Sequence, residues 1–319
     1  MGTRVVVNDS MNVFLDFDIG GDVDDMMCLA FLLACDEFDL KGISTVLWNV
    51  WERAEEALTF LQAAGHCHVP VACGCSSTMA PNFRHPDRIG YDQWARGFKL
   101  CEQAQIAGFE DSADRPLPIH GVDFLIDRCM REHEQVIPVL TAVLTDMAMA
   151  LVKEPRLCDV VPQLAIMAGE FESDHIEQNI RCDVTAADIV FRSNLKATVI
   201  PFKVGVDCRL CEEEVRAIGE SEKPSLKLLY RAIRGWQEYC REDSALAGPC
   251  LFDPCVPIAL LRPEFFQWKQ GRVLVDTGAG DSCGRTRFEE DALGPHRLAV
   301  SVDRDLVVGF FMERILGNA

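Results

Sequence analysis

Five aspartates near the amino terminus constrain this chain more than any other feature of its sequence. They lie in residues 13–30, VFLDFDIGGDVDDMMCLA, between one apolar run and the next. The five are Asp16, Asp18, Asp22, Asp24 and Asp25. Carboxylates crowded at the end of a buried strand repel one another and resist ionising together unless a cation neutralises them. The sequence therefore predicts a metal site where the first strand ends.

Strand-like and helix-like segments alternate along the chain. The expected strands are residues 13–16, 40–46, 69–72, 136–140, 163–167 and 197–201. The expected helices are residues 25–34, 51–64, 142–152, 186–191 and 256–261. This alternation predicts an α/β fold with a mostly parallel central sheet flanked by helices in a Rossmann-like topology. Repeats, low-complexity tracts and linker-like stretches are absent from the sequence, so we expect residues 1–319 to form a single domain.

The charge of the chain narrows the class of partner. Thirty-one basic residues against 50 acidic ones give a net charge of −19, which disfavours nucleic acids and anionic membranes as partners. The sequence contains no apolar run long enough to span a membrane. The 15 cysteines are scattered and odd in number, and we expect no signal peptide before them. We therefore expect a cytoplasmic protein with mostly free thiols that acts on a small molecule.

The aspartates have a purely structural alternative, because Asp24 and Asp25 open the expected helix and could cap its free N–H groups. One aspartate would satisfy that need, so five favour a metal or catalytic role. Oxygen ligands select calcium or magnesium over zinc, and cages with many oxygens favour calcium. A further ligand must come from elsewhere in the chain. Asp253, just before the apolar residues 256–261, is the best candidate, although it too could be a helix cap.

Several motifs, taken in order, resemble one known family. The segment DFDIGGDVDD after an apolar strand resembles the amino-terminal signature of the inosine-uridine-preferring nucleoside hydrolases, in a variant with two additional residues before the final aspartate pair. The later segments that resemble the family are residues 43–49, 70–75, 140–151, 166–170, 177–180, 252–254 and 275–286, the last as a strand pair. The resemblance thus runs from about residue 12 to the carboxyl terminus.

The resemblance implies an activity and a set of site residues. Family members hydrolyse the N-glycosidic bond of ribonucleosides, releasing base and ribose, with a bound calcium ion. The implied metal ligands are Asp18, Asp25, the main-chain carbonyl of Thr141, and Asp253, and Asp18 would also be the general base that activates a water molecule. The implied ribose-binding residues are Asp24, Asn49, Met167, Glu177 and Asn179.

Departures from the family pattern concern the base and the 5′-hydroxyl. Phe252 stands where the pyrimidine-accepting branch has a histidine that protonates the leaving base. Phenylalanine cannot donate a proton but can stack on a base, which favours purine nucleosides. Residues 168–176 lack the asparagine that grips the 5′-hydroxyl in the family and offer Glu170, Glu172, Asp174 and His175 instead. The candidates for the base pocket are His85, Tyr91, Trp94, Tyr230 and Trp236.

Two other functions stay open at this point. A haloacid-dehalogenase-like phosphatase also begins with two aspartates after a buried strand, and Asp16 would then be the nucleophile with magnesium bound. A family member with little or no hydrolase activity could bind nucleosides or ribose, although such a binder has little use for the general base Asp18. In either form of the family we expect a homo-oligomer, a dimer or a tetramer.

Overall fold

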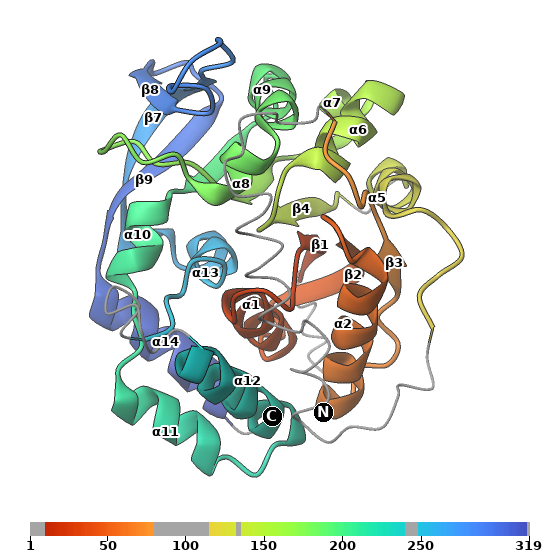
Figure 1. Cartoon of the computed structure of the whole chain (residues 1–319), viewed down its shortest axis with the longest axis vertical. Helices are drawn as coiled ribbons and strands as arrows, with labels where there is room; N and C mark the ends of the chain where they lie inside the picture. Colours follow the sequence, from red (N-terminus) through yellow and green to blue (C-terminus); the bar gives the residue numbers. More distant parts are fainter. Residues whose placement is uncertain (1–9, 80–114, 132–134, 240–247, 318–319) are drawn as a thin grey trace, which may run out of the picture.

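A nine-stranded sheet runs through the middle of the computed structural model, which describes residues 10–79, 115–131, 135–239 and 248–317 (Figure 1). The strands are β1 (Met11–Phe17), β2 (Phe38–Thr45), β3 (Val71–Cys73), β4 (Ile137–Leu140), β5 (Leu164–Met167), β6 (Ala197–Ile200), β7 (Phe266–Val275), β8 (Thr286–Glu290) and β9 (His296–Val302). Their order across the sheet is β3-β2-β1-β4-β5-β6-β9-β7-β8. The first seven strands in this order, from β3 across to β9, pair in parallel, whereas β7 runs antiparallel to both β9 and β8. The predicted mostly parallel sheet is confirmed.

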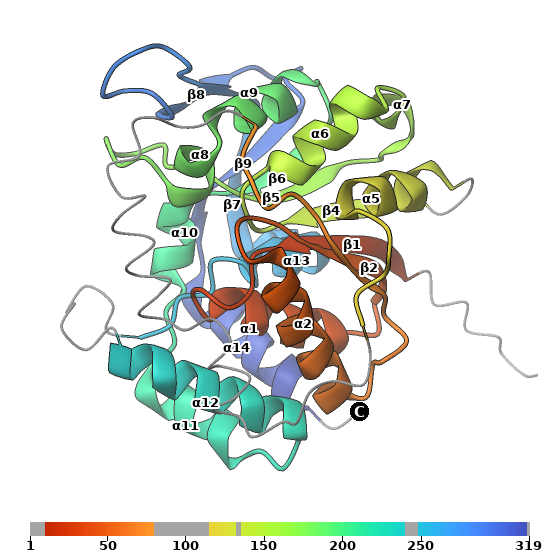
Figure 2. The same ribbon diagram turned by 45° about the vertical axis from the view of Figure 1, so that its right-hand side comes forward.

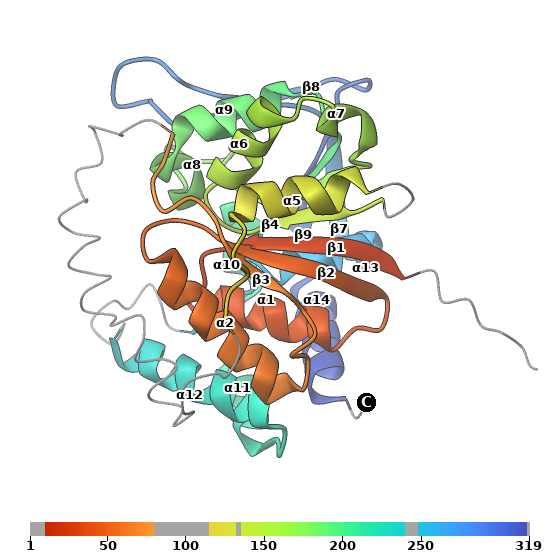
Figure 3. The same cartoon turned by 90° about the vertical axis from the view of Figure 1, so that its right-hand side faces the viewer.

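Helices cover both faces of this sheet. They are α1 (Asp24–Leu33), α2 (Val50–Ala64), α5 (Gly121–Met130), α6 (Thr145–Lys153), α7 (Leu157–Val160), α8 (Gln178–Cys182), α9 (Val184–Arg192), α10 (Phe202–Asp207), α11 (Glu212–Glu220), α12 (Pro224–Tyr239), α13 (Cys255–Leu261) and α14 (Arg304–Leu316). Figure 3 shows α5, α6 and α9 on one face and α1, α2 and α12 on the other. The sheet is therefore the middle layer of three, as alternating strands and helices lead us to expect.

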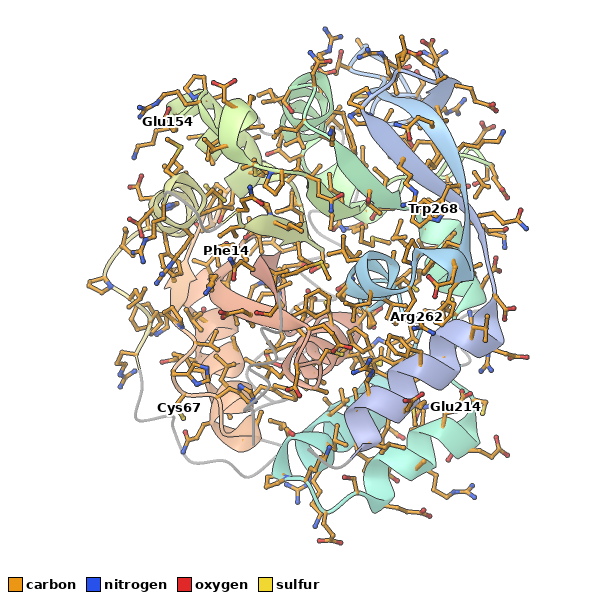
Figure 4. All side chains as sticks on the ribbon, turned by 180° about the vertical axis from the view of Figure 1, so that it is seen from behind. Phe14, Cys67, Glu154, Glu214, Arg262 and Trp268 are labelled. Carbon is orange, nitrogen blue, oxygen red and sulfur yellow. The ribbon has the colours of Figure 1, made fainter. Side chains whose placement is uncertain are left out.

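Strand β1 shows why this segment forms a central strand. Residues 13–17 are all buried, because helices cover both faces of a parallel sheet. Phe14, labelled in Figure 4, points to the face covered by α5 and meets the Phe124 ring edge-on, with the ring centroids 5.3 Å apart. Gly42 on β2 makes room for this contact, since a Cβ there would lie 2.5 Å from the Phe124 ring. Leu15 packs on the opposite face.

One predicted segment is wrong. Residues 275–286, expected to be a strand pair, form the connection between β7 and β8, and the strands lie on either side of it. Its glycines explain the difference, because Gly280 and Gly284 adopt φ angles of +150° and +90°, which strand residues do not use. The pair Val275 and Thr286 closes the hairpin.

The composition leads us to expect free thiols and no membrane-spanning segment. Each cysteine in the described part of the chain is a free thiol. No helix among the described residues is both long enough and apolar enough to cross a membrane.

The carboxyl ends of β1, β4, β5 and β6 meet at one edge of the sheet, where parallel α/β folds bind ligands. The segments after β1, β4 and β5 carry most of the residues that the resemblance singled out, while Asn49 follows β2 and Asp253 precedes α13. In Figure 2, α8 and α10 lie one above the other at this edge.

Candidate active site

A tight turn after β1 brings the aspartates together. Gly20 takes a φ of +103°, which allows the chain to reverse into α1. The main-chain N–H of Asp18 donates to Oδ1 of Asp25 over 3.2 Å, so the two ends of the turn are tied directly. Asp22 accepts a hydrogen bond from the N–H of Val23 at 2.6 Å, which stabilises the turn itself. Val23 occupies the N-cap position of α1, so an aspartate does not fill that position.

Three carboxyl groups converge beyond this turn. Single oxygen atoms of Asp24, Asp25 and Asp253 all lie within 4.8 Å of one another. The residues are 9 %, 3 % and 2 % exposed, respectively. Burial raises the pKa of each carboxyl well above its ordinary value, and repulsion from neighbouring aspartates, including Asp18, raises it further. Because the donor set is oxygen only and its charges oppose one another, these residues fit a hard divalent cation.

Asp18, the candidate general base, lies beside a buried arginine. The Arg53 side chain is 0 % exposed and its Nη2 lies 3.6 Å from Oδ2 of Asp18. Arg53 also donates to the carbonyl oxygens of Ile19 at 2.7 Å and Leu47 at 3.0 Å. Burial raises the pKa of Asp18, and the guanidinium opposes this rise. Arg53 thus holds the carboxylate from behind.

Sequence reasoning missed Arg53, because an arginine in an amphipathic helix is normally taken for a surface residue. A signal was present: position 53 lies four residues before Ala57 and seven before Phe60, on the apolar stripe of α2.

Thr141 and Asn179 connect the turn after β4 to the aspartates. The Thr141 hydroxyl lies 3.5 Å from Oδ1 of Asp25. The carbonyl oxygen of Thr141, the predicted metal ligand, accepts a hydrogen bond from the Asn179 amide at 3.1 Å. The same amide contacts the carbonyl oxygen of Met167 at 3.3 Å. Three residues singled out from separate segments are therefore in one hydrogen-bonded group next to the carboxyl cluster.

Glu177 and Asn49, predicted to bind ribose, differ in their surroundings. Glu177 is buried and caps α8, accepting from the N–H groups of Asn179, Ile180 and Gly169. Burial raises the pKa of this carboxyl, and the three N–H donors oppose the rise. Asn49 is exposed at the N-cap position of α2, where its side chain caps nothing. Glu177 is thus a helix cap and Asn49 is not, and ribose binding by both residues stays a prediction.

Phe252, beside the metal candidate Asp253, begins a row of rings. It stacks on Phe202 of α10, with centroids 5.2 Å apart and planes 15° apart. The His175 ring also contacts Phe202, with the ring centroids 4.9 Å apart and the planes tilted by 38°. We call Phe252, Phe202 and His175 the aromatic row. Sequence reasoning noted Phe252 and His175 separately and missed Phe202.

The predicted base pocket is not assembled by the described residues. Trp236 is 2 % exposed and packs in the core, and Tyr230 packs against Gly219 of α11 and the Arg234 guanidinium. This packing gives no support to a role for either ring in binding a base. His85, Tyr91 and Trp94 lie outside the described residues.

Asp16 lies behind the site and does not face it. It is 1 % exposed, and the Ser44 hydroxyl donates to its Oδ1 at 2.5 Å. Burial raises its pKa well above the ordinary value, and the neighbouring carboxyl of Asp146 raises it further. Asp146 in turn accepts from the N–H of Cys75 at 2.7 Å. The contacts of Asp16 are thus with Ser44 and Asp146 and not with the converging carboxyl groups, which gives no support to the phosphatase alternative.

Comparison with known proteins decides the family. The model of the inosine-uridine preferring nucleoside hydrolases matches residues 13–309. The chain belongs to this family. The prediction of the family, and with it of a hydrolase acting on N-glycosyl compounds, is confirmed.

The relatives of this nucleoside hydrolase carry different base preferences in their names. A probable uridine nucleosidase of Arabidopsis thaliana is 25 % identical, covering 98 % of this chain and 99 % of its own. A pyrimidine-specific ribonucleoside hydrolase of Photobacterium profundum is 27 % identical, with 96 % and 99 % covered. A solved purine-preferring ribonucleoside hydrolase of Gardnerella vaginalis is 26 % identical, with 95 % and 98 % covered, and superposes with a TM-score of 0.82.

Proposed function

We propose that this nucleoside hydrolase uses a calcium ion to hydrolyse the N-glycosidic bond of ribonucleosides, purine ribonucleosides before pyrimidine ones. The observation that carries the proposal is the convergence of Asp24, Asp25 and Asp253 at the carboxyl edge of the sheet. Buried carboxylates at such distances repel one another strongly, so a cation of charge +2 is their natural complement. Calcium suits this set because carboxylate and carbonyl oxygens surround it without strict geometry.

The residues that would hold the ion are Asp18, Asp25, Asp253 and the carbonyl of Thr141, with Asp24 beside them. When bound, the ion supplies positive charge that acidifies a neighbouring water and orients the ribose hydroxyls. Asp18 accepts the proton of the attacking water. Arg53 keeps the Asp18 carboxylate in place from the interior, at 3.6 Å.

The sugar lies over the group formed by Met167, Glu177 and Asn179 in this proposal, with Asp24 and Asn49 near the 2′-hydroxyl. As the bond to the base lengthens, positive charge develops on the ribose ring. The carboxylates around it stabilise this charge most in the transition state, which is where stabilisation accelerates the reaction.

The preference for purines rests on Phe252. A phenyl ring offers a stacking surface to a base and no proton, and the larger purine ring system gains more from stacking. Two of the relatives above are named for uridine or pyrimidine, which makes the comparison of inosine with uridine the informative one.

The test is release of reducing sugar from adenosine, inosine, guanosine, uridine and cytidine by the purified chain with calcium. The proposal predicts turnover that is lost with a chelator and restored by calcium, with kcat/KM for inosine above that for uridine. Turnover of uridine alone would overturn the purine preference. No turnover of any of the five, with calcium bound, would favour instead a family member that only binds nucleosides or ribose.

The proposal also includes a single domain over residues 1–319, a homo-oligomer of two or four copies, and a cytoplasmic location. Each has a direct test: limited proteolysis, light scattering and localisation of a tagged chain.

A further inference from the structure

The departing base presents a chemical problem that the acidic cluster does not solve. When the C1′–N bond breaks, the electron pair stays on a ring nitrogen of the base, and the departure is slow unless that negative charge is neutralised. Carboxylates stabilise the ribose side of this bond, where positive charge develops, and would repel the base side. A proton or hydrogen-bond donor is therefore needed near the base, and Phe252 cannot be that donor.

The aromatic row leads from the carboxyl cluster to such a donor. Phe252 is joined to Asp253 by the chain, and its ring packs into the space that Gly205 of α10 leaves, where any Cβ would overlap it. Phe202 stacks on Phe252, and His175 follows at 4.9 Å from Phe202. Both phenyl rings are half-buried and His175 is exposed, so the row runs outward from the cluster.

The row is fixed to the predicted ribose site through a single residue. The carbonyl oxygen of Gly169 accepts from the N–H of Phe202 at 2.8 Å, and the N–H of Gly169 donates to Glu177 at 3.0 Å. Phe202 and Glu177 are thus held by the two successive peptide groups that flank the Cα of Gly169. His175 lies two residues before Glu177 in the same connection, so sugar contacts and ring contacts come from one segment.

The imidazole of His175 is available for this task. No hydrogen bond joins its ring nitrogens to another residue in the described part of the chain, where its main-chain N–H alone has a partner, the Ser173 hydroxyl at 3.3 Å. Burial and then the charge of Arg181 lower the pKa of the imidazole, while Glu170 opposes them. A histidine can carry a proton near neutral pH and donate through either nitrogen.

We propose, resting on the function proposed above, that His175 is the catalytic acid for the leaving base. The C1′–N bond breaks, its electron pair goes to the base nitrogen, and a ring N–H of His175 gives that base its proton. The water oxygen forms the new bond to C1′ and its proton goes to Asp18. Solvent then returns a proton to His175 and removes one from Asp18. In this proposal Phe202 packs against the imidazole and holds the imidazole toward the base.

The test compares two leaving groups in the variant His175→Asn. Inosine and uridine leave as bases that need a proton, whereas the p-nitrophenolate of p-nitrophenyl β-D-ribofuranoside leaves without one. Loss of a general acid costs about 10²-fold or more in kcat. We expect a loss of that size for the nucleosides and less than about threefold for the aryl riboside. His68→Asn, at an exposed histidine in the turn after α2, is the matched control and should leave both rates unchanged.

The outcomes are distinct. Equal losses for nucleoside and aryl riboside would assign His175 to sugar binding or to structure and overturn the proposal, as would unchanged nucleoside turnover. If the wild-type chain hydrolyses neither substrate, the proposed function fails first. Because His175 is exposed, the variant should fold, and an unchanged Tm with unchanged calcium binding verifies this.

Discussion

In the proposed site, the two sides of the N-glycosidic bond are lined by different kinds of side chain. On the ribose side, Asp24, Asp25 and Asp253 are buried carboxyl groups that destabilise one another without a cation. On the base side, Phe252, Phe202 and His175 are partly exposed rings that pack well without any ligand. The difference shows that the cost in stability of the metal-free fold lies in the carboxyl groups and not in the rings. Crowding of the acidic groups is unfavourable without a cation and so indicates function, whereas the aromatic side is stable by itself and needs functional evidence.

The largest expected effect is on the acidic side. Asp253→Asn keeps the shape of the side chain and removes one of the cluster's charges. We expect kcat/KM for the best nucleoside to fall about 10³-fold, equivalent to about 4 kcal/mol in activation free energy. In a chelator the variant should have a higher Tm than wild type, because one repelling charge is gone. Steady-state kinetics and calorimetry measure these, with Asp207→Asn on the exposed face of α10 as control.

A lower Tm for Asp253→Asn in the chelator would contradict this account of the cluster. It would show that the carboxyl stabilises the fold, as an ordinary helix cap does.

The second effect concerns Arg53, the positive charge behind the acidic side. Arg53→Met removes the ion pair with Asp18 and leaves the carbonyls of Ile19 and Leu47 without donors. The free energy of unfolding should fall by about 3 kcal/mol, as expected for one partner of a buried pair. Urea denaturation measures it. Arg192→Met, at an exposed pair with Asp188, should change it by less than about 0.5 kcal/mol. Equal losses of unfolding free energy in the two variants would mean that the buried ion pair stabilises the fold no more than the exposed one.

Much of the acidic side could be predicted from the sequence, because its residues lie at strand ends and helix starts that local periodicity marks. Asp18 follows β1, and Asp24 opens α1, as expected. Asp253 was expected from its place before an apolar helix, which the structure has as α13.

The aromatic row could not be predicted, because its rings come from the segment after β5, the start of α10 and the turn before α13, and their meeting depends on the order of β5 and β6 in the sheet. A lone phenylalanine such as Phe202 carries no local signal. Arg53 was missed because the burial of a charged side chain depends on its tertiary partners. The ends of β7 and β8 were missed because glycines interrupt the strand pattern between them.

A third prediction sharpens the difference between a functional and a structural histidine. His296 is 1 % exposed and its Nδ1 accepts from the N–H of Val273 at 2.8 Å. Burial lowers its pKa to about 4, with Arg272 contributing, against about 6.5 when unfolded. The unfolded chain therefore binds more protons between these values, and stability present above pH 6.5 falls by up to about 3 kcal/mol as the pH drops to 4.

Urea denaturation across this pH range tests the third prediction. His296→Gln should flatten the pH dependence, and His175→Asn should leave it as in wild type. A flattened profile for His175→Asn would show that the exposed histidine acts in the fold.

The smallest effect is expected at Asp22. Its carboxyl accepts from Val23 inside the turn and is not one of the three converging groups. Asp22→Ala should change calcium affinity and kcat/KM by less than about threefold, since a turn residue touches neither ion nor sugar. Calcium titration of Asp22→Ala beside Asp25→Ala measures this. Loss of binding in the first with retention in the second would reverse the roles assigned within the turn.

The central claim is that the buried carboxyl groups bind calcium. The most direct test is to titrate calcium into the chelator-treated wild-type chain and to measure the binding by isothermal titration calorimetry. The account predicts one calcium ion bound per chain, with a rise in Tm, and no binding at the same site in Asp25→Asn. Failure of wild type to bind calcium, or binding that Asp25→Asn leaves intact, would contradict it.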